Sequence, residues 1–269
     1  MISFRSWHSV TIALLMAVTG CVQFAPGGPA PVPTPTTGTD VLQRMASHYA
    51  GKWFQTMQFT QENTRYASNG RTERSQWKEY VLVPGRLRIE FMPATGGNGA
   101  IYADGSIFSF EGGKLARTTP QVNILLLLTA DVYAQSVTKS ATQLTALGVD
   151  VTHVRSDSWN NRRVWVVGGT GVTDVGSTQF WVDAETWVVL RVIDRASVAP
   201  SPTQTSRPAI EYRLGDYRVL NGIPVVHEIQ FLREGQPFFK EQYTDVVLNT
   251  ALDARLFSSS QWEIPGRIP

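Results

Sequence analysis

The chain has 269 residues, with 24 Lys and Arg against 22 Asp and Glu, which gives a formal net charge of +2. Hydrophobic residues make up 42% and aromatic residues 10%, as is typical of a globular protein. The longest basic run is Arg162-Arg163, so the composition excludes nucleic acid as an expected partner. The single cysteine excludes an intramolecular disulfide and a zinc–thiolate site.

Residues 1–20 have the order of a secretory signal peptide. Residues 1–9 carry Arg5 and no acidic residue, residues 10–18 (VTIALLMAV) are almost wholly apolar, and Thr19 and Gly20 are small. This apolar run is too short for a membrane-spanning helix, which needs about 20 residues, and no other stretch is long enough. Because Arg5 is the only charged residue in the segment, its removal leaves a net charge near +1.

The lone cysteine, Cys21, follows the small residues directly. The sequence Val18-Thr19-Gly20-Cys21 resembles the lipobox of bacterial lipoproteins. The resemblance implies that a diacylglyceryl group, with acyl chains such as palmitate, is attached to the sulfur of Cys21, and that a peptidase cuts just before it. An ordinary signal peptide or an incidental cysteine is the alternative. Val22, in place of the Asp that retains lipoproteins in the inner membrane of enteric bacteria, favours the outer membrane.

Residues 21–39 are predicted to be the lipidated cysteine and a flexible tether. The segment after Cys21 is rich in Pro, Gly and Thr and has no charged residue, so it cannot build a core. Fully extended, it reaches about 55 Å at roughly 3.1 Å per residue. Residues 40–269 are predicted to form a single domain.

The domain is predicted to begin with a helix over residues 40–54, because apolar residues recur there at spacings of three and four. Asp40 and Gln43 have the spacing of a capping box. The period then changes to two, and turn dipeptides such as Asn69-Gly70 predict antiparallel hairpins. The strands expected before the middle of the chain span residues 57–61, 77–83, 87–91, 101–102 and 107–110.

Residues 120–147 have a helical composition, and strands return after Gly148. Five large aliphatic residues run from Ile124 to Leu128. Such a run is either a helix buried between the sheet and its neighbours or a lid over an apolar cavity. About ten or eleven antiparallel strands are expected in total, the later ones over residues 149–154, 163–168, 178–182, 187–193, 210–220, 223–233 and 238–248.

Most of residues 40–258 resemble the Lol superfamily of lipoprotein carriers and receptors, the outer-membrane lipoprotein-sorting proteins. The resemblance rests on Gln179-Phe180-Trp181-Val182-Asp183 with Trp187 and Arg191, on Asp216-Tyr217-Arg218 leading into Asn221-Gly222-Ile223-Pro224, and on Asn249 and Leu256-Phe257. It implies a mainly β (α+β) fold: a strongly curved antiparallel sheet that forms an incomplete barrel, with helices over its concave face. It also implies an apolar cavity for acyl chains between the sheet and the helices. The membrane-anchored receptor carries an exposed leucine on a protruding loop, and residues 94–99 have none.

Large apolar side chains in the predicted strands and helices are the candidates for lining this cavity. They are Phe59, Trp77, Phe91, Phe108, Phe110, Leu125, Leu128, Trp165, Phe180, Trp181 and Phe231. Alternating aromatic residues are usually core residues, so only part of this set is expected to face a cavity.

No catalytic residue, metal site or cofactor is predicted. The histidines are scattered, and His227-Glu228 lacks the second histidine of a zinc-protease helix. There is no G-x-S-x-G elbow and no P-loop. The protein is therefore not expected to be an enzyme.

The predicted function is that of a lipoprotein anchored in the outer membrane and facing the periplasm. It binds lipid, or the acyl chains of other lipoproteins, for transport or sorting. The expected partners are these acyl chains, the membrane through the anchor, and a periplasmic carrier protein. The alternatives are a module for envelope sensing or assembly, and a structural protein whose sheet packs on the helices without a cavity.

Overall fold

The computed structural model describes residues 33–169, 176–195 and 209–262. Residues 1–20, Cys21 and the tether up to residue 32 lie outside the described residues, so the predictions for them stay predictions. The compact unit considered below is Pro35–Pro269. In the described ranges, no helix has the length and apolar character needed to cross a bilayer.

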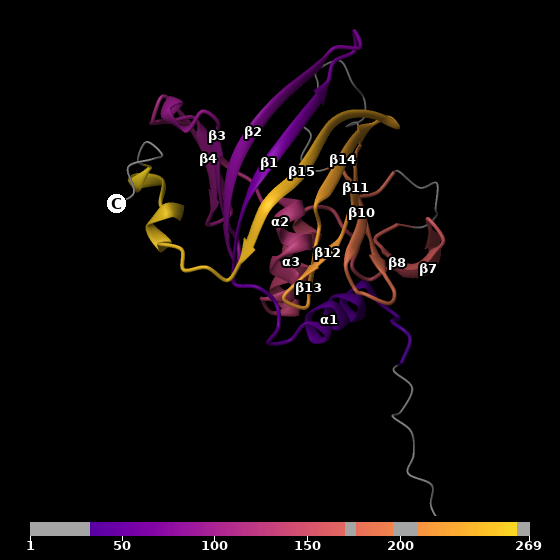
Figure 1. The fold of residues 1–269 in the computed structure, drawn as a ribbon. Coiled ribbons are helices and arrows are strands. Elements are labelled where there is room, and N and C mark those ends of the chain that lie inside the picture. The colour runs from indigo at the N-terminus through magenta and orange to yellow at the C-terminus, as the bar shows by residue number, and fades with distance from the viewer. Residues whose placement is uncertain (1–32, 170–175, 196–208, 263–269) are drawn as a thin grey trace, which may run out of the picture. The chain divides into compact units, whose positions relative to one another are not determined.

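An antiparallel sheet dominates this unit (Figure 1). In the described part of the chain it has 13 strands, in the order β6-β5-β4-β3-β2-β1-β15-β14-β11-β10-β9-β8-β7. The strands are β1 (Thr56–Tyr66), β2 (Thr72–Leu82), β3 (Arg86–Phe91), β4 (Gly99–Ala103), β5 (Ser106–Glu111), β6 (Lys114–Pro120), β7 (Val154–Trp159), β8 (Arg162–Val167), β9 (Gln179–Asp183), β10 (Val189–Asp194), β11 (Ile210–Gly215), β14 (Glu228–Arg233) and β15 (Gln236–Leu248).

The first strand and the last strand pair at the middle of the sheet. β1 is joined to β2 by the predicted Asn69-Gly70 turn, and on its other side it pairs with β15, from Met57 opposite Leu248 to Arg65 opposite Phe239. This β1–β15 pairing, which we call the seam, joins two meanders, one from each half of the chain. β6 and β7 remain as separate edges, so the sheet is not closed.

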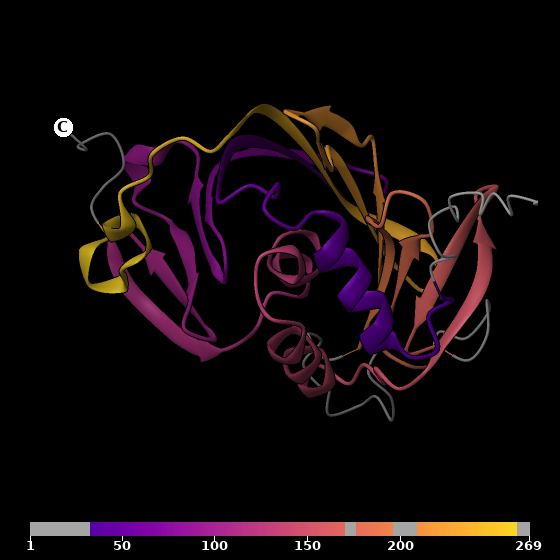
Figure 2. The ribbon, with the colours of Figure 1, turned by 90° about the horizontal axis from the view of Figure 1, so that it is seen from below.

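In the ranges that the structure describes, three α-helices lie against the inner side of the curved sheet: α1 (Gly38–His48), α2 (Ile124–Thr129) and α3 (Val137–Ala146) (Figure 2). We call this side of the sheet the concave face. α1 contacts β8, and α2 contacts β10. The predicted fold, a curved antiparallel sheet forming an incomplete barrel with helices over its concave face, is confirmed.

The boundaries of the first helix differ from the prediction. α1 begins at Gly38 and ends at His48, and Thr37 is its N-cap. The Thr37 hydroxyl accepts a hydrogen bond from the Asp40 amide (3.1 Å), and the Asp40 carboxylate accepts one from the Thr37 amide (2.9 Å). The predicted capping box of Asp40 with Gln43 was wrong, because Asp40 is itself the third helical residue.

Several predicted strands differ in extent from those observed, and one observed strand was not predicted. β6 was not predicted, because most of its residues are exposed and polar and show no alternation. β7 lies over residues 154–159 in place of 149–154. The strand predicted over residues 210–220 ends at Gly215, and residues beyond it form a separate hairpin of β12 (Arg218–Leu220) and β13 (Ile223–Val225).

The segment of residues 253–262 covers the outer, convex face of β3 and β4. It contains the 3₁₀ helices η3 (Ala254–Phe257) and η4 (Ser259–Gln261) and ends at Trp262. Trp262 stacks on Phe110 at a centroid distance of 4.2 Å, and the Arg88 guanidinium lies 3.9 Å from its ring centre. Ile101 and Ala103 complete this second apolar cluster, which is separate from the main core.

Candidate functional site

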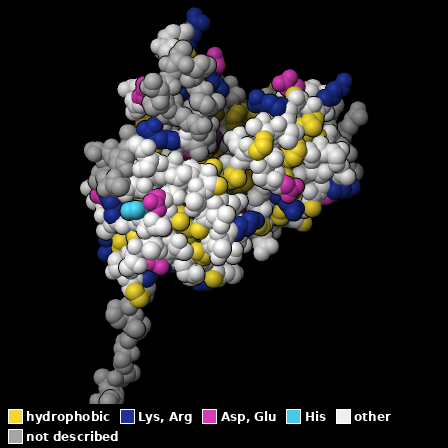
Figure 3. Space-filling view, turned by 180° about the vertical axis from the view of Figure 1, so that it is seen from behind, with side chains coloured by type: hydrophobic (Ala, Val, Ile, Leu, Met, Phe, Trp, Pro, Cys, Tyr) yellow, Lys and Arg dark blue, Asp and Glu magenta, His cyan; other side chains and the backbone are white. Residues whose placement is uncertain are grey.

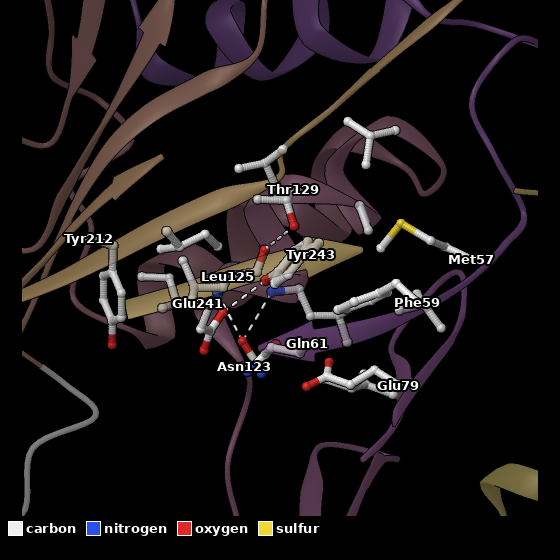
Figure 4. A pocket seen from close by; sticks show the side chains of 18 of the residues that line it. Met57, Phe59, Gln61, Glu79, Asn123, Leu125, Thr129, Tyr212, Glu241 and Tyr243 are labelled. Carbon is white, nitrogen blue, oxygen red and sulfur yellow. Dashed lines mark hydrogen bonds between the residues drawn. The ribbon is translucent and has the colours of Figure 1, made fainter. Parts of the chain in front are cut away.

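A cavity of about 240 Å³ lies between α2 and the concave face of the sheet (Figure 4). Its sheet wall comes from strands on both sides of the β1–β15 seam, and its opposite wall from residues 121–133. The apolar side chains of the sheet wall include Met57, Phe59, Val81, Leu87, Ile89, Ile229 and Phe231. The structural alternative predicted a sheet packed on the helices without such a volume, so the cavity argues against it.

α2 divides the aliphatic run between cavity and core. Its N-cap, Asn123, accepts hydrogen bonds from the amides of Leu125 and Leu126 (3.0 Å each), which fixes the first turn. Leu125 is partly buried and lines the cavity, whereas Leu128 is fully buried in the core. The two interpretations of this run therefore apply to different residues of the same short helix.

Aromatic rings pack in pairs around the cavity. Phe59 lies 4.3 Å from Tyr243 between ring centres, across the seam. Trp53 stacks on Tyr133 at 3.9 Å, and both rings also line the cavity. In the view from behind, hydrophobic side chains are visible in a hollow of the surface (Figure 3). These paired rings form part of the cavity wall.

Polar side chains occupy one part of this apolar wall. Gln61 on β1, Glu79 on β2 and Glu241 on β15 all line the cavity and are all buried (Figure 4). The Tyr243 hydroxyl donates a hydrogen bond to Glu241 (2.9 Å), and the Gln61 side-chain amide donates one to Asn63 (2.7 Å). Two carboxyl groups thus face the same cavity.

Burial determines the proton affinity of these groups. It raises the pKa of Glu241 to about 7, although hydrogen bonds from Tyr243 and Gln61 act in the opposite direction. Burial also raises the pKa of Glu79 well above its ordinary value, and the nearby Glu241 charge adds to this rise. Burial and the Glu79 charge raise the pKa of Tyr102 to about 12, so this phenol is neutral at physiological pH.

The structure brings four of the eleven predicted cavity residues into this lining, namely Phe59, Trp77, Leu125 and Phe231. Phe91 is at the end of β3, 36% exposed, and packs on the Trp77 ring. Leu128 on α2 and Phe180 on β9 belong to the main core, and both are fully buried.

The other four predicted residues lie away from the cavity, three of them for reasons of register. Phe108 and Phe110 pair with Ile101 and Gly99, so they face the convex side and join the Trp262 cluster. Trp181 pairs with Arg191, which faces away from the cavity, and the Arg191 guanidinium covers its ring at 4.4 Å. Trp165 packs against the main core from β8.

Sequence reasoning missed Gln61, Glu79 and Glu241, because a charged or amide residue in a strand usually faces water. Their position in the alternation of each strand could have indicated that they share a face with apolar residues. Glu79 is two residues from Trp77 and from Val81, so all three share one face of β2. Gln61 has the same relation to Phe59.

No protein-family model and no curated protein sequence matches the chain. Solved structures do match. An outer membrane lipoprotein-sorting protein domain from Vibrio parahaemolyticus superposes with a TM-score of 0.58 at 12% identity, over 84% of this chain and 97% of that one. A DUF1329 family protein from Desulfovibrio piger gives 0.55 at 14% identity, over 84% and 98%.

A LolA superfamily protein from Nitrosomonas europaea gives a TM-score of 0.52 at 10% identity, over 84% of this chain and 99% of that one. These neighbours are matched over almost their whole length, so the likeness includes both halves of the sheet and the helices between them. At such low identity the likeness concerns the fold. The chain has the fold of the LolA superfamily and of outer membrane lipoprotein-sorting domains.

Proposed function

We propose that this protein is a lipoprotein of the cell envelope whose cavity holds the acyl chains of a lipid or of another lipoprotein and passes them on without covalent chemistry. The observation that carries the proposal is the cavity under α2, with its aliphatic and aromatic walls. Its volume of about 240 Å³ exceeds the ~150 Å³ of an apolar cavity that binds benzene. It therefore has room for a segment of an alkyl chain.

The energetics favour such a ligand. Transfer of a sixteen-carbon chain from water gains roughly 13 kcal/mol gross, at about 0.8 kcal/mol per methylene. Ordering of the chain and incomplete burial reduce this gain. A carrier must also release its cargo, and a cavity that covers only part of a chain makes release easier.

Photo-crosslinking in the bacterial envelope tests the proposal on the full-length protein. A diazirine amino acid is placed at Leu125, which lines the cavity, and at Leu115, which is 51% exposed on β6, as the matched control. We expect acyl lipid adducts, identified by mass spectrometry, from position 125 and not from position 115. Adducts with protein alone at position 125 would instead support the sensing or assembly alternative.

We further propose that Cys21 carries the lipid anchor and that Val22 directs the protein to the outer membrane. The support is the lipobox-like sequence Val18-Thr19-Gly20-Cys21. Metabolic labelling with an alkyne analogue of palmitate tests this directly. The label is expected on the wild-type protein and is expected to be lost in Cys21→Ser. Equal labelling of both proteins would contradict the assignment of Cys21.

A further inference from the structure

Two buried carboxyl groups face the cavity from strands on either side of β1. Glu79 on β2 is 4% exposed and Glu241 on β15 is 8% exposed. Across the strand pairs, Glu79 is opposite Phe59, and Glu241 is opposite Asn63. Gln61 lies between these two positions of β1, on the same face. The carboxyl groups are therefore part of the cavity wall and not of the outer surface.

The residues around the cavity supply few hydrogen-bond donors and little positive charge to stabilise these carboxyl groups. Of the residues described as lining the cavity, none is Lys, Arg or His. Glu241 accepts a hydrogen bond from Tyr243. The Glu79 carboxyl makes no hydrogen bond and no ion pair with any residue in the described ranges. Tyr102, Tyr212 and Tyr243 are the neighbouring titratable groups, and burial raises the pKa of each phenol.

A buried carboxyl without a partner is costly to the fold, and a ligand that supplies the missing donor removes this cost. We propose that the cavity selects amphiphiles carrying a primary ammonium group beside their alkyl chains, and that the carboxyl groups of Glu79 and Glu241 in its wall attract this ammonium group. An ammonium group brings one positive charge and three donors to a wall that offers carboxyl oxygens and, among the residues described as lining it, no basic side chain. This inference rests on the proposed function, because the apolar wall is taken to hold the alkyl chains.

A metal ion fits the site less well. Hard cations such as Ca²⁺ take six to eight oxygen ligands, and the described residues contain no group of three or more side chains able to hold one. The ammonium has two sources that share the same chemistry. One is the free α-amine of a lipoprotein cut before its lipidated cysteine. The other is the head group of an aminophospholipid.

The test uses the full-length protein in phosphatidylcholine vesicles at pH 7. Four photoactivatable probes are compared at trace amounts: a diacyl lipopeptide with a free α-amine, the same lipopeptide with the amine acetylated, a phosphatidylethanolamine and a phosphatidylglycerol. The yield of each probe crosslinked to cavity peptides is measured by mass spectrometry. The variants are Glu79→Gln and Glu241→Gln, with Glu62→Gln as control, since Glu62 is exposed on β1.

We expect the wild-type protein to capture an amine probe at least tenfold more than its partner without the amine. The lipopeptide pair and the phospholipid pair show which source is preferred. Glu79→Gln and Glu241→Gln are expected to abolish the preference while still capturing both probes, and Glu62→Gln is expected to keep it. Equal capture by the wild-type protein, or a preference that persists in Glu79→Gln and Glu241→Gln, overturns the inference. If no probe is captured at all, the proposed function itself fails.

Discussion

The Tyr243 hydroxyl donates a hydrogen bond of 2.9 Å to the carboxylate of Glu241, two residues earlier on the same face of β15. Across the seam, Tyr243 is opposite Gln61 and Glu241 is opposite Asn63. A strip of polar side chains therefore crosses the junction of the two halves of the sheet. All four of these residues are buried, so the strip belongs to the interior of the protein.

The free energy of unfolding is expected to fall as the pH rises from 5 to 8. The folded-state pKa of Glu241, about 7, is above its ordinary value of 4.5, so the folded chain binds this proton more tightly than the unfolded chain does. The resulting stability is full below pH 4.5 and is lost as the pH rises through 7, by up to about 3 kcal/mol. Glu79 acts in the same direction.

Urea unfolding followed by tryptophan fluorescence measures this dependence. Glu241→Gln removes the titrating group and is expected to make the profile flatter than that of the wild-type protein. Glu62→Gln is exposed and is expected to leave it unchanged. The lowered pKa values of Asp40 and Asp150, both about 2, affect stability only at more acidic pH. A Glu241→Gln profile as steep as the wild-type profile would show that Glu241 does not titrate in this way.

Two leucines of α2 are expected to respond differently to truncation. Leu128→Ala opens a cavity in the packed core and should lower the free energy of unfolding by about 2–5 kcal/mol. Leu125→Ala removes a partly buried side chain from the cavity wall and should cost less than about 1 kcal/mol. Its effect should instead appear as weaker lipid crosslinking from a diazirine at Phe231. If both variants lose the same stability, the division of this helix between cavity and core is wrong.

Trp262→Ala is expected to loosen the convex side of the sheet and leave the cavity intact. The indole stacks on Phe110, and its Nε1 donates a hydrogen bond to the Gly97 carbonyl (3.2 Å). Loss of a buried tryptophan costs about 3–5 kcal/mol. Hydrogen exchange should become faster in β3, β4 and β5, whereas Leu115→Ala, at an exposed site, should leave it unchanged. Unaltered exchange in Trp262→Ala would mean that the segment of residues 253–262 does not support these strands.

Thr37→Ala is expected to destabilise the protein by about 1 kcal/mol through loss of the N-cap of α1. The Thr37 hydroxyl accepts the Asp40 amide hydrogen bond that begins the helix. Thr37→Ser keeps this acceptor and should restore most of the stability, as measured by thermal unfolding. A serine variant as unstable as the alanine variant would point to the Thr37 methyl group and not to the cap.

The sequence was informative where structure is decided locally. Asn69-Gly70 lies in the predicted turn between β1 and β2, and Asn221-Gly222 joins β12 to β13. Gly70, Asn221 and Gly222 have the positive φ angles that tight turns require. The alternation of β2 similarly places Trp77 and Val81 on one face. Such patterns involve neighbours in the chain and need no knowledge of the rest of the fold.

Contacts between distant segments were not predictable in this way. No local pattern indicates that β1 pairs with β15, or that Trp262 covers Phe110. Trp181 and Phe231 look alike in the sequence as aromatic residues of apolar strands, yet only Phe231 meets the cavity. The difference depends on which face of each strand the helices cover, and on where the helices leave space. Glu79 and Glu241 were not predicted to line the cavity for a related reason, since their burial depends on packing between segments that are distant in the chain.

The position of β15 has a consequence for the order of events after synthesis. Until residues 236–248 are in place, β1 has an open edge and the wall that carries Glu241 and Tyr243 does not exist. A chain emerging N-terminus first can form the β1–β6 meander early, because its contacts are local. The cavity, however, is completed only by one of the last segments to appear. A chain that ends before β15 therefore lacks a complete cavity.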